Sequence, residues 1–127
     1  MSTRVLVIDD DDSILELFKM VLEPQGFNVH LSKTTYEDVK HVEALHPSLI
    51  ILDAKLGQQY EGFLLLEKLK LYPPTKSIPV ILCSAALEEI RQQEDTLRQK
   101  GIPIVYKPFG LDELLDAIEQ CLQQTRT

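Results

Sequence analysis

The sequence predicts an α/β protein in which five strands alternate with five helices and form a parallel sheet with helices on both faces. Short apolar runs recur along the chain, and stretches with helical spacing of apolar residues separate them. The length of 127 residues suits one domain. Strands that alternate with helices pair in parallel through right-handed crossovers. We therefore expect a single α/β domain over residues 1–127.

The first half of the chain predicts three strands and two helices, with strands expected at 4–8, 27–31 and 49–52. The third strand is apolar throughout, which is typical of a strand covered on both faces. The first helix is expected to begin at Ser13, which fits a capping box with Glu16, and to stop at Gly26. Thr35 can cap the second helix, which Pro47 interrupts.

The second half predicts a loop at 54–61 and then two further strands and three further helices. The helices are expected at 63–71, at 87–100 and from Leu111 onward, and the strands at 78–83 and 102–106. The helix at 87–100 has only three large apolar residues, Leu87, Ile90 and Leu97. Because so little packing can hold it, we expect it to be the loosest helix.

Charge and composition exclude several classes of function. The formal net charge of -7 has the wrong sign for binding a phosphate backbone or an anionic membrane surface. The two cysteines, Cys83 and Cys121, lie in apolar patterns without a CxxC partner, so we expect reduced core residues. No segment approaches the roughly 20 apolar residues that span a bilayer. We therefore expect a cytoplasmic protein without direct nucleic-acid or membrane partners.

Polar residues end four of the predicted strands. Asp9 and Asp10 follow the first strand, Asp53 the third, Ser84 the fourth and Lys107 the fifth. In open α/β sheets, ligands bind outside the carboxyl ends of the strands, so these side chains should share one site. Neighbouring carboxylates repel one another unless a cation offsets their charge. Oxygen ligands favour magnesium, and we therefore expect Mg²⁺ at this edge of the sheet.

The chemistry expected at this site is phosphorylation of Asp53. Asp10 and Asp53 are expected to bind the metal directly and Asp9 through water, and a backbone carbonyl near Lys55 could fill a further position. Asp53 can attack phosphorus while the metal and the Lys107 ammonium neutralise charge on the phosphoryl oxygens, to one of which the Ser84 hydroxyl donates. The Lys55 side chain has two open interpretations, a second cation near the pocket or a solvated loop lysine.

Four motifs, VLVIDDD, LIILDA, VILCSAA and YKPF, each close a predicted strand in order along the whole chain. With them the sequence resembles the receiver domain of bacterial two-component response regulators. The resemblance implies a flavodoxin-like sheet of strand order 2-1-3-4-5, an acidic pair at Asp9 and Asp10, and Asp53 as acceptor of phosphate from a sensor histidine kinase or phosphotransfer protein. It also implies that Ser84 is a switch hydroxyl and that Lys107 precedes a cis peptide to Pro108.

The sequence departs from that family pattern in two places, the loop after Asp53 and the fifth strand. The loop from Lys55 to Glu61, before Gly62, is one residue longer than usual and lacks a proline, which leaves the carbonyl ligand open. The switch aromatic of the family falls at Ile104, and Tyr106 could replace it because residues two apart on a strand face the same side. We expect a stand-alone receiver, not an enzyme, that signals to a downstream protein through its fourth helix, fifth strand and fifth helix.

Two other functions fit parts of the pattern. Asp9, Asp11 and Ser13 match the DxDx[ST] pattern of haloacid-dehalogenase-like phosphatases, in which Asp9 would be the nucleophile. This alternative is weakened because the later carboxylates fall within the last helix, at Asp112, Glu113 and Asp116. The other alternative is a receiver-like binding module that is never phosphorylated, which the altered loop keeps open.

Overall fold

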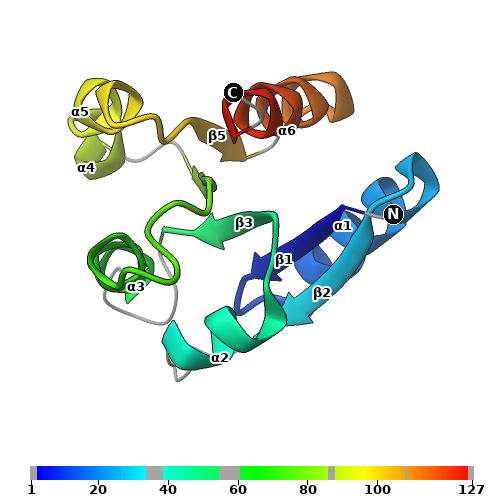
Figure 1. Ribbon diagram of the computed structural model, residues 1–127. Coiled ribbons are helices and arrows are strands. Elements are labelled where there is room, and N and C mark those ends of the chain that lie inside the picture. Colours follow the sequence, from blue (N-terminus) through cyan, green and yellow to red (C-terminus); the bar gives the residue numbers. More distant parts are fainter. Residues whose placement is uncertain (1–2, 34–38, 55–60, 86–87, 108, 126–127) are drawn as a thin grey trace.

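The computed structural model describes residues 3–33, 39–54, 61–85, 88–107 and 109–125 (Figure 1). The sheet in these residues has five parallel strands in the order β2-β1-β3-β4-β5, as the sequence predicts. Its strands are β1 (Arg4–Ile8), β2 (Asn28–Ser32), β3 (Leu49–Asp53), β4 (Val80–Ala85) and β5 (Ile104–Lys107). Strand β3 is buried along its whole length, in agreement with its continuous apolarity.

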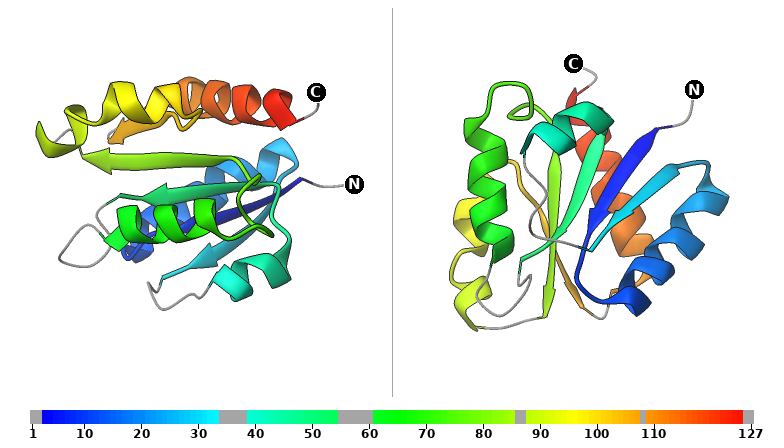
Figure 2. Two further views of the ribbon diagram at one scale, coloured as in Figure 1. Left: turned by 60° about the vertical axis from the view of Figure 1, so that its left-hand side comes forward. Right: turned by 90° about the horizontal axis from the view of Figure 1, so that it is seen from below.

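The helices cover both faces of the sheet (Figure 2). Their bounds are α1 (Asp12–Leu22), the 3-10 turn η1 (Glu23–Gln25), α2 (Val39–Leu45), α3 (Glu61–Leu71), α4 (Glu88–Arg91), α5 (Glu94–Gln99) and α6 (Leu111–Thr125). One core cluster joins the sheet to α1 and α6, and a second joins its other face to α2, α3, α4 and α5. Among the helices of the described residues, none is both long enough and apolar enough to cross a bilayer.

Alternation along the strands divides the core between the two faces. Val5 and Val7 pack in the cluster with α1 and α6, whereas Leu6 and Ile8 pack in the cluster with α2 to α5. The same alternation runs through β3, β4 and β5, since successive residues of a strand face opposite sides. Both cysteines are free and buried in the first of these clusters. Their predicted place in the core is confirmed.

The N-cap of helix α1 lies two residues earlier than the capping-box pattern predicts. Asp11 is the N-cap, with extended backbone angles, and its carboxylate accepts a hydrogen bond from the Ser13 N–H at 2.8 Å. The prediction that Ser13 caps this helix is therefore wrong. An aspartate in the preceding turn already satisfies a backbone donor of the first turn. The predicted stop at Gly26 is confirmed, because Gly26 has a φ of 95° and follows η1.

The strands after β3 begin later than predicted because of two prolines. Pro79 and Pro103 have no N–H to donate to a ladder, and each precedes the first residue of a strand. Their carbonyl oxygens still accept hydrogen bonds, from the N–H groups of Ile50 and Leu82, at 3.0 Å each. The prolines thus set where β4 and β5 start. The predicted cap Thr35 lies outside the described residues.

The helix predicted at 87–100 is divided into α4 and α5. A turn at residues 92–93 separates the two segments, and the Gln93 N–H donates to the Ile90 carbonyl rather than continuing the α-helical ladder. Within the described residues 88–100, the large apolar side chains that are buried are Ile90 and Leu97. These two anchors are seven residues apart, and all the residues between them are polar.

Candidate functional site

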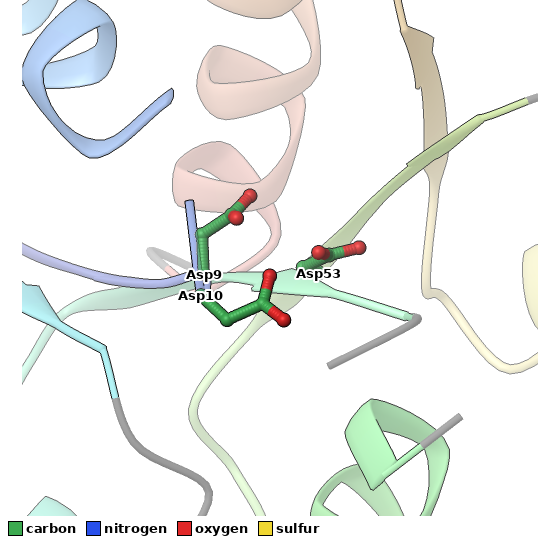
Figure 3. Close-up of side chains that lie close together, drawn as sticks. All are labelled: Asp9, Asp10 and Asp53. Carbon is green, nitrogen blue, oxygen red and sulfur yellow. The ribbon is translucent and has the colours of Figure 1, made fainter. Parts of the chain in front are cut away.

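Three carboxylates meet at the carboxyl ends of β1 and β3. These strands are neighbours, and their register pairs Ile8 with Leu52, so the residues that follow lie side by side. One oxygen from each of Asp9, Asp10 and Asp53 lies within 4.8 Å of the others (Figure 3). The convergence predicted from the strand ends is therefore present in the structure.

Burial distinguishes these three acids. Asp9 and Asp53 are 2% and 8% exposed, whereas Asp10 is exposed to solvent. The Asp9 Oδ1 atom accepts a hydrogen bond from the Asp11 N–H at 2.9 Å, which fixes its carboxylate beside the first turn of α1. A buried carboxylate keeps its charge only where hydrogen bonds and opposite charges offset the loss of water.

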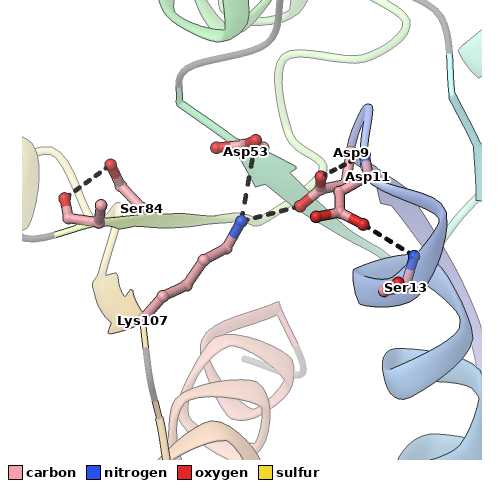
Figure 4. Close-up of polar contacts among 7 residues, drawn as sticks. Asp9, Asp11, Ser13, Asp53, Ser84 and Lys107 are labelled. Carbon is pink, nitrogen blue, oxygen red and sulfur yellow. Dashed lines mark hydrogen bonds and ion pairs between the residues drawn. The ribbon is translucent and has the colours of Figure 1, made fainter.

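Lys107 supplies opposite charge from the end of β5. Its Nζ atom lies 3.0 Å from Asp9 Oδ2 and 3.8 Å from Asp53 Oδ2 (Figure 4). Burial alone would lower the pKa of Lys107. The hydrogen bond to Asp9 and the charges of Asp53 and Asp9 outweigh that effect, so the pKa of Lys107 is raised. The lysine is therefore held in its charged form between two strand ends.

The charges and donor atoms of this site fit a divalent cation. Three carboxylates carry three negative charges when ionised, and Lys107 carries one positive charge, which leaves two negative charges to be offset. Carboxylate oxygens are hard donors, which suit Mg²⁺, and the exposed Asp10 leaves room for the waters that this ion retains. The backbone carbonyl of Lys55 lies outside the described residues.

The hydroxyl of Ser84 is not gathered with these groups. Ser84 is buried at the end of β4, one residue beyond Cys83, which is the register partner of Asp53. Its hydroxyl donates to the Ala85 carbonyl oxygen at 3.0 Å, and in Figure 4 this pair lies apart from the group formed by Asp9, Asp53 and Lys107. The sequence predicted the position of Ser84 on the sheet but not the direction of its hydroxyl.

A glycine that the sequence analysis did not assign to the site packs directly against it. A Cβ atom on Gly62, in the first turn of α3, would lie 2.0 Å from the Asp53 carbonyl oxygen and 2.8 Å from that of Ala54. Only glycine allows so close an approach without displacing backbone. Its place between a strand-end aspartate and a helix start is the one sequence signal that could have indicated this contact.

The predicted switch positions lie on β5, beside the site. Ile104 is buried in the core cluster with α2 to α5, and Tyr106 packs against the same cluster. This confirms that the two residues face the same side. The Tyr106 hydroxyl also donates to Glu94 Oε1 at 2.6 Å, a contact that the sequence did not indicate. Pro108 lies outside the described residues.

The residues that suggest a phosphatase do not assemble into a second site. The Asp11 carboxylate caps α1 through the Ser13 N–H and so acts in the helix start. The three later acids, Asp112, Glu113 and Asp116, all lie within α6, and all are exposed. Among the described residues, the acidic group close enough to share a metal consists of Asp9, Asp10 and Asp53.

A parallel sheet of this order, with an acidic cluster and a lysine at its carboxyl edge, defines a receiver domain. The family model for the response regulator receiver domain matches residues 5–119. The chain therefore belongs to this family, and the comparison does not favour the phosphatase alternative.

The relatives and neighbours agree with that membership. The chain is 30% identical over 122 residues to the DNA-binding dual master transcriptional regulator RpaA of Synechocystis. It is 28% identical over 127 residues to the transcriptional regulatory protein SrrA of Staphylococcus aureus, and 28% over 120 residues to the regulatory protein AtoC of Escherichia coli. These matches cover 96%, 100% and 94% of the chain, but only 50%, 51% and 25% of the respective relatives. The chain thus spans about half or less of their length.

Solved structures show the same architecture at nearly full coverage. A CheY-like receiver domain protein from Methanospirillum hungatei gives a TM-score of 0.80 at 25% identity, covering 99% of this chain and 98% of that one. The receiver domain of a Luxo repressor protein from Vibrio parahaemolyticus gives 0.82 at 25% identity, covering 99% and 94%. The fold of the described residues is that of a receiver domain.

Proposed function

We propose that this protein is a phosphorylation-dependent signalling switch in which Asp53 accepts a phosphoryl group from a phosphohistidine of a sensor histidine kinase or phosphotransfer protein. The observation that supports this role most directly is the meeting of Asp9, Asp10 and Asp53 within reach of the Lys107 ammonium. Membership of the receiver family supports it independently. The protein acts as an acceptor in this reaction and not as an enzyme with a separate substrate.

The transfer step follows from the placement of Asp53 and Lys107. A carboxylate oxygen of Asp53 forms a bond to phosphorus as the bond between phosphorus and the imidazole nitrogen breaks, and the imidazole leaves with the bonding pair. The Lys107 ammonium, 3.8 Å from the Asp53 carboxylate, is close enough to stabilise negative charge on the phosphoryl oxygens. Lys107 therefore acts in the step itself and also holds the site together beforehand.

Asp9, Asp10 and Asp53 would hold the magnesium ion, with Asp9 acting through water and the Lys55 carbonyl as a further ligand. When bound, magnesium neutralises negative charge at the acceptor and on the phosphoryl group. The Asp9 carboxylate is already committed to Lys107 and to the Asp11 N–H, which supports its indirect role. Asp10 is exposed and so leaves room for the waters that magnesium retains, which supports its role as a direct ligand.

The Ser84 hydroxyl would change its hydrogen-bond partner when Asp53 is phosphorylated. Its hydroxyl is bonded to a neighbouring backbone carbonyl, and rotation about one side-chain bond would redirect it. A phosphoryl group on Asp53 would offer a charged acceptor, which forms a stronger hydrogen bond than a neutral carbonyl. We propose that this exchange passes along β5, with Tyr106 as the aromatic that responds, to a downstream protein target, without direct contact between this domain and nucleic acid. Two free buried thiols support a cytoplasmic location.

The test is phosphorylation by acetyl phosphate with magnesium, followed by intact mass measurement and location of the modified residue. We expect the mass of one phosphoryl group to be added at Asp53. Asp53→Asn should abolish the addition, and removal of magnesium should suppress it. Asp112→Asn is the matched control, because Asp112 is an exposed acid on α6, and it should be modified like the wild type.

The other outcomes contradict the proposal in different ways. A label on Asp9 would favour the phosphatase-like nucleophile. Failure of the wild type to accept phosphate, both from acetyl phosphate and from phosphohistidine donors, would favour a binding module that is never phosphorylated.

A further inference from the structure

Tyr106 contacts both short helices, α4 and α5, from β5. Its hydroxyl donates to Glu94 Oε1 at 2.6 Å, and Glu94 is the first residue of α5. The guanidinium carbon of Arg91, the last residue of α4, lies 5.5 Å from the centre of the Tyr106 ring. An arginine at that distance over an aromatic ring is attracted by the ring's negative face. One side chain of the sheet thus binds both sides of the turn at residues 92–93.

These contacts add to the anchors of two short helices, α4 and α5. The helices are four and six residues long, well below the length at which a helix is stable alone. Ile90 and Leu97 anchor them to the core, and Arg98 pairs with Glu94 at 3.5 Å within α5. The contacts of Tyr106 are placed midway between the two anchors, where the apolar spacing fails.

Tyr106 is also coupled to the phosphorylation site through its backbone. It directly precedes Lys107, whose ammonium contacts Asp9 and Asp53. In the register between β4 and β5 it is the partner of Ser84. The strand segment from which the Tyr106 ring projects is therefore continuous with Lys107 and paired with Ser84.

We propose that Arg91, Glu94 and Tyr106 form a latch that holds α4 and α5 against β5 in the unphosphorylated protein and opens when Asp53 is phosphorylated. This inference rests on the proposed function, because the site is what opens the latch. Two sites linked in this way affect each other equally. A latch that favours the unphosphorylated state must weaken binding of a phosphoryl group, and loss of the latch must strengthen it.

The probe is beryllofluoride, a phosphoryl mimic, titrated at fixed magnesium and followed by NMR. Tyr106→Phe removes the hydroxyl bonded to Glu94 and keeps the ring. We expect its half-saturating beryllofluoride concentration to fall by about three- to tenfold, the range expected for one hydrogen bond. Glu94→Ala should shift binding in the same direction. In the absence of the probe, amide hydrogen exchange across residues 88–99 should become faster in both variants.

Tyr72→Phe is the matched control. Tyr72 directly follows α3, and its hydroxyl donates to Glu43 Oε1 of α2 at 2.7 Å, away from β5. This variant loses the same kind of bond and should bind beryllofluoride like the wild type. If Tyr106→Phe speeds exchange but leaves beryllofluoride binding unchanged, the contact is only structural and the latch is refuted. If the wild type itself does not bind beryllofluoride with magnesium, the proposed function fails, and the latch fails with it.

Discussion

Helix α6 and the pair α4 and α5 cover the same sheet but are held to it in different ways. Helix α6 runs unbroken for 15 residues, and buried side chains recur along it every three or four residues, at Leu114, Ala117, Ile118 and Cys121. The connection from β4 to β5 has Ile90 and Leu97 as buried anchors, seven residues apart. An unbroken apolar stripe gives a helix contact with the core on every turn. The connection from β4 to β5 has no apolar residue between its two anchors.

The difference shows where a small domain can change shape. A charge added at the edge of the sheet does not directly change apolar contacts, so a helix held by them should keep its position. Polar contacts such as the one between Tyr106 and Glu94 depend on geometry and can be exchanged for other contacts. Elements with few buried contacts are the ones that open locally at low cost in free energy. The expected output face consists of the helix at 87–100, which is now α4 and α5, together with β5 and the last helix, α6. We infer that α4, α5 and β5 are the part of this face that responds most to phosphorylation.

Truncation of a stripe residue in α6 should have the largest effect. Ile118→Ala removes a side chain that is 1% exposed in the core, and we expect the free energy of unfolding to fall by about 2–5 kcal/mol. Urea denaturation measures this change, and hydrogen exchange should show faster exchange throughout the domain. Gln123→Ala, an exposed position on the same helix, should change stability by less than about 0.5 kcal/mol. Exchange that increases in α6 alone would contradict the distinction between the two regions.

Truncation of the anchor in α5 should cost less and act locally. Leu97→Ala also creates a cavity in the core, but its helix is short and can shift to fill the space. We expect a loss near the lower end of the range for such changes, about 2 kcal/mol, with faster hydrogen exchange limited to residues 88–99. A loss equal to that of Ile118→Ala, with exchange raised across the sheet, would show that α5 is as firmly integrated as α6.

An apolar residue added between Ile90 and Leu97 should make α4 and α5 more like α6 in stability. Gln93 lies in the turn between α4 and α5 and lines a groove of about 160 Å³ against Phe63 and Leu66 of α3. Gln93→Leu would place an apolar side chain in this groove and restore contact between the anchors. Leucine gives up the interaction that Gln93 makes, and we expect the added apolar burial to outweigh it. The free energy of unfolding should rise by up to about 1 kcal/mol, and exchange at residues 88–99 should slow. If Gln93→Leu lowers stability, the lack of an apolar residue between Ile90 and Leu97 does not explain why this helix is divided into α4 and α5.

Much of the fold and of the acidic site could be predicted from the sequence because both depend on repeating patterns. Alternation of apolar runs with helical stripes predicts the sheet, and parallel strands bring Asp9, Asp53 and Lys107 to one edge. The strand starts were harder to predict, because the effects of Pro79 and Pro103 on the ladder appear only once the strands are paired. The apolar patterns of the sequence indicate which strands form and which residues lie at their ends. The residue at which each strand begins depends on the hydrogen bonds between paired strands.

Other features depend on which of several possible hydrogen-bond partners a polar side chain takes, and sequence patterns do not determine that. The cap of α1 is Asp11 and not Ser13, since two candidates that lie two residues apart compete for backbone donors of the first turn. The Ser84 hydroxyl turns to its own strand because a carbonyl is available there. Glu94 becomes important through the Tyr106 hydroxyl, which donates a hydrogen bond to its carboxylate. Each outcome is a choice among nearby partners, which requires three-dimensional placement to resolve.

The pKa of Tyr106 should report the contact between β5 and α5, and its measurement needs no substitution in the wild-type protein. Burial, the hydrogen bond to Glu94 and the negative charge of Glu94 raise the pKa of Tyr106 to about 12. A free tyrosine titrates near pH 10, so the stability that this group contributes is present below about pH 10 and is lost as the pH rises towards 12. NMR titration of the ring measures this pKa directly. In Glu94→Ala it should fall towards the ordinary value, because two of its three causes are removed. A wild-type Tyr106 that titrates near pH 10 would mean that the hydroxyl is free in solution and that polar contacts do not hold this edge of the sheet.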